Sequence, residues 1–83
     1  MTHAENLSFG YGQNAAFWTY KQARSLVDGN SKIQDKPIIE LATDAVITAL
    51  RQDWENDGLD PNRIDLNLAV HGLIKALEDE ILS

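Results

Sequence analysis

A single amphipathic segment, residues 37–56, places the strongest constraint on how this chain can fold. With successive residues 100° apart on a helical wheel, its apolar side chains cover a wide arc and leave only a narrow polar strip. Pro37 suits the first turn of such a helix, where its missing N–H has no partner to lose. The segment is therefore predicted to be the central helix, with neighbours on two sides. Its arc comprises Ile38, Ile39, Leu41, Ala42, Ala45, Val46, Ala49 and Leu50.

The residues that follow indicate a second helix joined to this one by a short turn. Gly58 suits the left-handed residue that ends a helix, while Asp60 and Pro61 suit the N-cap and first turn of the next helix. That helix is predicted over residues 61–81. A connection of about three residues favours an antiparallel hairpin of the two helices. The apolar stripe of the later helix contains Leu66, Ala69, Val70, Leu73, Leu77 and Ile81.

The first part of the chain is predicted to contain an arm and one further helix. Over residues 13–28 small and apolar residues recur at helical spacing, and Gly29 suits a left-handed end. Residues 1–12 are polar with scattered aromatic residues and two glycines, so we expect an N-terminal arm, either docked or mobile. The expected fold class is all-α, a small three-helix domain of residues 13–83 preceded by this arm.

The size of the chain bounds its stability and its location. A chain of 83 residues has little material for a core, and without cysteine it can form no disulfide. We therefore expect a homo-oligomer, in which a second copy adds buried surface. No apolar run approaches the roughly 18 residues of a membrane helix, and the first residues lack the pattern of a signal peptide. We expect a soluble cytoplasmic protein with no cofactor and no membrane partner.

The net charge of −6 comes entirely from residues 41–83, which hold nine acidic and three basic side chains. An acidic chain argues against direct nucleic-acid binding, because contacts to phosphates need positive charge, and it favours a protein partner with a basic surface. Two alternatives are mimicry of nucleic-acid phosphates and acids that only cap helices and maintain solubility. The acids gather around the predicted turn as Asp53, Glu55, Asp57, Asp60 and Asp65.

Part of this acidic turn, residues 53–58, is similar to the start of a calcium-binding loop, with alternating oxygen-bearing side chains and a glycine at the sixth position. The twelfth position, where a glutamate should complete the site, is Ile64, and Pro61 lies inside the loop. Two adjoining helix caps explain the same residues, so divalent-cation binding is kept as a third hypothesis and no metal site is assigned. Capping does not explain Asp53, which lies within the apolar arc of its helix, so Asp53 is the first acid to examine for a specific role.

Two groups of side chains lie outside the main stripes and are candidates for partner binding. Phe17 and Trp18 are either buried beneath the arm or exposed as an anchor for a partner. The other group is a weaker apolar seam on the last helix, which is either an interface or surface scatter. His71 in this seam has no nucleophile near it in the sequence, so we expect no enzyme. The seam contains Ile64, Leu68, His71 and Lys75.

The second half of the chain also resembles a known group of proteins. The resemblance spans residues 37–79. It rests on an acidic amphipathic helix, the acidic turn, Ile64-Asp65-Leu66 and Gly72-Leu73-Ile74-Lys75-Ala76-Leu77. This pattern is similar to small acidic proteins of T4-like tailed phages, including those of cyanobacteria, but it lacks their basic, His-Pro-containing tail. The resemblance implies a viral origin and a role in host takeover or virion assembly within the host cytoplasm. It carries no site residues.

These observations favour a non-enzymatic protein-interaction module, which in the phage setting would be a modulator or inhibitor of a host protein. A partner would dock on Phe17 and Trp18 or on the seam of the last helix, with the acidic turn steering a basic surface. The alternative is a structural homo-oligomer, for example a virion or assembly protein.

Overall fold

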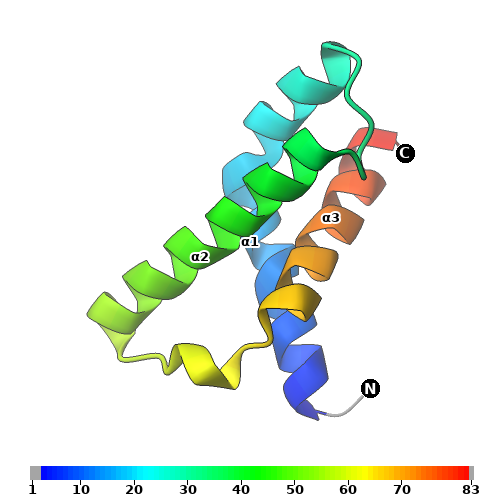
Figure 1. The fold of residues 1–83 in the computed structure, drawn as a ribbon. Coiled ribbons are helices and arrows are strands. Elements are labelled where there is room, and N and C mark those ends of the chain that lie inside the picture. Colours follow the sequence, from blue (N-terminus) through cyan, green and yellow to red (C-terminus); the bar gives the residue numbers. More distant parts are fainter. Residues whose placement is uncertain (1–2, 83) are drawn as a thin grey trace.

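The computed structural model describes residues 3–82, which form three α-helices and contain no β-strand (Figure 1). The predicted all-α class is confirmed. Helix α1 spans His3–Asp28, α2 spans Lys36–Asp57 and α3 spans Leu66–Leu82, with a single 3-10 turn, η1, at Pro61–Arg63 before α3. Within this described part of the chain, no helix is long and apolar enough to cross a membrane.

The predicted N-terminal arm is wrong from residue 3 onward, because residues 3–12 are the first turns of α1; residues 1 and 2 lie outside the described residues. The glycine at position 12 has a packing role here. A Cβ at Gly12 would lie 1.7 Å from the carbonyl oxygen of Ala69, and a Cβ at Gly72 would lie 2.2 Å from that of Phe9. Both glycines therefore allow the backbones of α1 and α3 to approach more closely than any side chain would permit.

Helices α1 and α3 run parallel and are joined near both ends. At one end the backbone N–H of Asp65 donates to the buried Oγ of Ser8 over 2.9 Å. At the other end Nη1 of Arg24 donates to the carbonyl oxygen of Ile81 over 3.5 Å. Each pair is 57 residues apart in the chain, so α1 and α3 keep the same register along the contact.

Helix α2 contacts both α1 and α3, as predicted, but it is not the central helix. It buries only one stripe, and two isoleucines, Ile39 within its apolar arc and Ile47 just outside it, are 41% and 39% exposed. The most extensive packing is that of α1 on α3, and α2 lies across this pair. The buried stripe of α2 consists of Ile38, Ala42, Val46 and Leu50.

The connection between α2 and α3 is longer than predicted. Gly58 ends α2 in the left-handed conformation, as expected, with φ of 69°. Asp60 and Pro61 then begin η1 rather than α3, and the Asp60 carboxylate accepts a hydrogen bond from the N–H of Asn62 over 2.9 Å. The carboxylate of Asp65 accepts from the N–H of Leu68, so Asp65 caps α3. The predicted start of the last helix at residue 61 is thus wrong, and residues 58–65 separate α2 from α3, which diverge toward η1 in Figure 1.

The end of α1 follows the predicted stop, but with a different residue in the left-handed conformation. Asn30 has φ of 80°, whereas Gly29 does not adopt a positive φ. The N–H of Ser31 reaches back to the carbonyl oxygen of Leu26 over 2.9 Å, and that of Asn30 reaches Val27 over 3.0 Å. These two bonds are those of a Schellman motif with Asn30 at its left-handed position.

Candidate functional site

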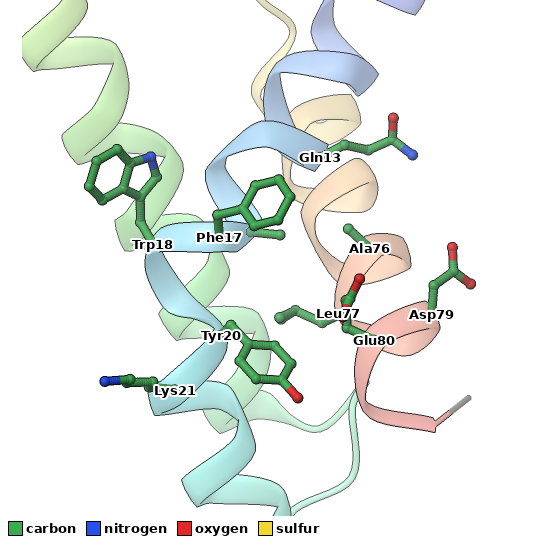
Figure 2. A pocket seen from close by; sticks show the side chains of 10 residues that line it. Gln13, Phe17, Trp18, Tyr20, Lys21, Ala76, Leu77, Asp79 and Glu80 are labelled. Carbon is green, nitrogen blue, oxygen red and sulfur yellow. The ribbon is translucent and has the colours of Figure 1, made fainter.

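Two large aromatic side chains project from the middle of α1. Phe17 is 80% exposed and Trp18 is 86% exposed. They are not buried beneath an arm, because residues 3–12 continue the same helix away from them. As neighbours on a helix they diverge by about 100°, so Phe17 is directed toward α3 and Trp18 toward α2 (Figure 2). We refer to Phe17, Trp18 and the exposed Lys21 one turn later as the α1 ridge.

A groove of about 450 Å³ lies between the α1 ridge and α3. Its lining includes the buried side chain of Leu77 and the half-buried Ala76 and Tyr20. Its lining includes charges of both signs, Lys21 on α1 and Glu80 on α3, although the Lys21 side chain extends away from α3 on the same side as Trp18 (Figure 2). The groove is thus apolar in its floor and carries both signs of charge at its edges.

A second groove, of about 340 Å³, lies on the other side of the ridge, between α1 and α2. Trp18 stands at its edge, and the α2 side is formed mostly by small or short side chains. Asp44 is the one charged residue in its lining. The α1–α2 groove is lined by Trp18, Thr19 and Gln22 from α1, and by Leu41, Asp44, Ala45, Thr48, Ala49 and Gln52 from α2.

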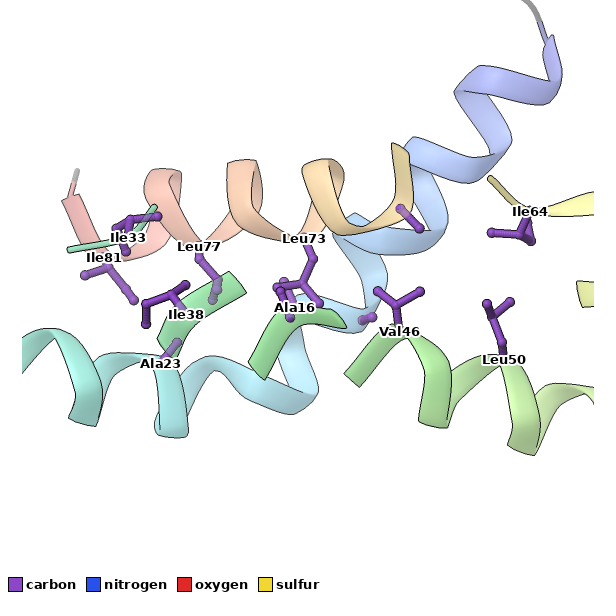
Figure 3. Close-up of a cluster of buried hydrophobic side chains, with 13 residues drawn as sticks. Ala16, Ala23, Ile33, Ile38, Val46, Leu50, Ile64, Leu73, Leu77 and Ile81 are labelled. Carbon is purple, nitrogen blue, oxygen red and sulfur yellow. The ribbon is translucent and has the colours of Figure 1, made fainter. Parts of the chain in front are cut away.

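The predicted seam on α3 does not form one open surface. Ile64 is 7% exposed and belongs to the hydrophobic core (Figure 3). The ring of His71 packs at 52° against that of Phe9 with centroids 5.8 Å apart, and Nζ of Lys75 lies 3.9 Å from Oε2 of Glu78. Leu68 is half-buried. His71 and Lys75 remain exposed. The sequence pattern missed the contact of His71 with Phe9 because residues 3–12 were expected to be an arm, whereas they form the first turns of α1.

The acidic turn has structural contacts of its own. Tyr11 of α1 donates a hydrogen bond from its hydroxyl to Oδ2 of Asp53, which explains why this acid lies within the apolar arc of α2. Burial raises the pKa of Tyr11 well above its usual value, and the hydrogen bond to Asp53 and the charge of that residue raise it further. Asp60 and Asp65 cap η1 and α3, while Glu55 and Asp57 are exposed. Within residues 3–82 no three acidic or histidine side chains are grouped to hold a metal ion.

One apolar surface was not singled out by the sequence. A groove of about 360 Å³ lies between the end of α2 and η1, where Trp54 is 54% exposed. Its sequence signal is Ile47 and Trp54, which lie two turns apart on one edge of α2.

Comparisons with protein-family models, curated proteins and solved structures give no match.

Proposed function

We propose that this chain is a non-enzymatic protein-interaction module whose docking surface is the α1 ridge. The observation that carries the proposal is the exposure of Phe17 and Trp18, at 80% and 86%, on adjacent positions of one helix. Single exposed apolar residues are common on protein surfaces, but two adjacent large aromatic side chains between grooves are not. Tryptophan in particular is enriched among the residues that contribute most to binding between proteins.

The shape and charge of this surface favour a protein partner over a small molecule or a nucleic acid. Small-molecule sites are concave and enclose their ligand, whereas the α1 ridge is a projection with a hollow on each side. Three acidic residues, Asp44, Asp79 and Glu80, line the adjacent grooves against one basic residue, Lys21, so the balance of charge there disfavours phosphates. A folded surface or helix that receives the two aromatic side chains fits both features.

The surroundings of the ionisable groups support a role without catalysis. His71 packs against Phe9, and the raised pKa of Tyr11 makes this hydroxyl a poorer acid at neutral pH. The resemblance of residues 37–79 to small acidic phage proteins supports a modulator of a host protein or an assembly protein as the biological setting. It assigns no residue to the docking surface.

The test is affinity capture from cells that contain the natural partner, with matched variants as bait. Phe17→Ala and Trp18→Ala remove exposed side chains, so both should fold like the wild type by circular dichroism. We expect each to lose most of the captured partner. Leu82→Ala is the matched control, because Leu82 is an apolar residue that is 67% exposed and lies outside the α1 ridge. Equal recovery by all four proteins would show that the ridge is not the docking surface.

A further inference from the structure

We infer that the partner of the α1 ridge is a second copy of this chain, and that each copy inserts Trp18 into the α1–α2 groove of the other. This inference rests on the proposed function, since it names the occupant of the same surface. It does not follow from exposure alone. It follows from the way in which the projection, the hollow and the charges are arranged around Trp18.

The face around Trp18 has both a projection and a hollow. A two-fold symmetric dimer needs one patch that is complementary to itself. Here a large projection, Trp18, stands directly beside a groove of about 340 Å³ whose far side carries small side chains, including Ala45 and Ala49. A two-fold axis that runs along the helices, in front of this groove, would set α1 of each copy opposite α2 of the other. Both tryptophans would then enter a groove at the same time.

The lining of the groove also contains polar side chains. The indole N–H of a buried tryptophan usually needs an acceptor. Thr48 and Gln52 line the α2 side of the groove and carry oxygen atoms that can accept a hydrogen bond. The hollow therefore offers apolar side chains to the indole ring and acceptors to its N–H.

Charges of opposite sign lie near Trp18 and in the groove, on Lys21 and Asp44. Helices α1 and α2 run in opposite directions, because Tyr11 near the start of α1 bonds to Asp53 near the end of α2. Lys21, after Trp18 on α1, and Asp44, before Thr48 on α2, are therefore displaced toward the same end of the molecule. Rotation about a two-fold axis along the helices does not change the position of a residue along that axis. It therefore brings Lys21 of each copy opposite Asp44 of the other.

The wider charge distribution agrees with self-association at this face. The net charge of −6 lies in residues 41–83, and five of its acids surround the turn after α2, beyond the groove. The chain from residue 1 to 40, which includes the α1 ridge, is neutral. Two copies that meet through α1 and the part of α2 that lines the groove thus keep their acidic turns outside the shared surface.

The buried area fits a dimer of moderate strength. Each buried tryptophan contributes about 150–250 Å² and covers a similar area of the groove, so two insertions account for about 600–1,000 Å². Stable specific interfaces bury about 1,200–2,000 Å² in total. The two insertions supply half of that area or somewhat more, and the flanking helix surfaces supply the rest. We therefore expect a dimer that dissociates on dilution.

The experiment is sedimentation of the purified chain from about 1 µM to about 1 mM, the range in which a moderate dimer dissociates. We expect the mass to rise from that of the 9.3 kDa monomer toward twice this value. Trp18→Ala should weaken the dimer at least tenfold, and Leu82→Ala should leave it unchanged. Lys21→Glu and Asp44→Lys should each weaken it, and the double variant should regain most of the loss, because exchanging both charges restores the pair.

The results separate this inference from the proposed function. The reciprocal insertion is wrong if the chain is monomeric at every concentration. It is also wrong if Trp18→Ala leaves the dimer affinity unchanged, or if the double charge exchange does not restore that affinity. If the chain is monomeric and still captures another protein in a Trp18-dependent manner, the proposed function stands and only the second copy is wrong. If neither self-association nor capture depends on Trp18, both are wrong.

Discussion

The close approach of α1 and α3 at Gly12 gives the sharpest prediction for stability. In Gly12→Ala the new methyl group would lie 1.7 Å from the carbonyl oxygen of Ala69, whereas real Cβ atoms are essentially never nearer than 3.0 Å to such an atom. The obstacle is backbone, so it cannot rotate away as a flexible side chain would. The two helices must separate by more than 1 Å or α1 must bend.

The magnitude follows from two opposing effects. Replacing glycine by alanine inside a helix stabilises that helix by about 1 kcal/mol. Forcing an extra carbon into a packed contact costs typically about 1–3 kcal/mol, and a backbone obstacle belongs at the upper end of that range. The net loss for Gly12→Ala is about 2 kcal/mol, a large share of the roughly 3–5 kcal/mol available to a domain of this size. It should lower Tm by about 8–16 °C.

The same helix provides the control. Gly10 also lies within α1, but a Cβ built there has no atom within 4 Å apart from its own neighbours. Gly10→Ala should therefore gain the helix propensity without the clash, and raise Tm by about 4–8 °C. Thermal unfolding followed by far-UV circular dichroism measures both. If the two variants shift Tm in the same direction, or if neither shifts it, the close packing of α1 on α3 is refuted.

Two further predictions concern Tyr11 and Asn30. The pKa of Tyr11 is higher in the folded chain than its unfolded value near 10, so its contribution to stability is complete below pH 10 and is lost as pH rises further. Tyr11→Phe should lower the free energy of unfolding at neutral pH by about 1 kcal/mol, and this free energy should then fall less between neutral and alkaline pH than in the wild type. Urea unfolding at both pH values measures the difference. An equal fall in the variant and the wild type would contradict the prediction. Asn30→Gly should raise Tm by a few degrees, because Asn30 has φ of 80° and glycine adopts this left-handed conformation without strain. Gly29→Ala should cause no backbone strain, because Gly29 does not have a positive φ. Equal effects of the two variants on Tm would contradict the assignment of Asn30 to the left-handed position.

Much of the fold could be predicted because helix signals are local. The apolar spacing of residues 37–56, Pro37 in the first turn and Gly58 at the end define α2 almost residue by residue. The start of α1 could not be found in this way. Gly10 and Gly12 weaken a helix by their intrinsic propensity, and only the tertiary contact with Ala69 gives Gly12 its role.

The misplaced start of α3 has a similar cause. Asp60-Pro61 and Asp65 are both acceptable beginnings of a helix, and local preference does not rank them. The choice depends on Ser8, far away in the chain, which accepts a hydrogen bond from the N–H of Asp65 at the entry into α3.

The candidate site was predictable in part, since Phe17 and Trp18 lie outside the apolar stripe of their helix. Their exposure depended on the course of residues 3–12.

The parallel contact of α1 with α3 also bears on how this chain can fold. Its closing hydrogen bonds join residues 57 apart, so α1 can meet its main partner only after α2 and η1 have been synthesised. Contacts of such long range are slow to form, because closing the long intervening loop costs conformational entropy before the contacts contribute. On the ribosome α1 and α2 would emerge with the small-residue face of α1 uncovered. Native structure must wait for residues 66–82.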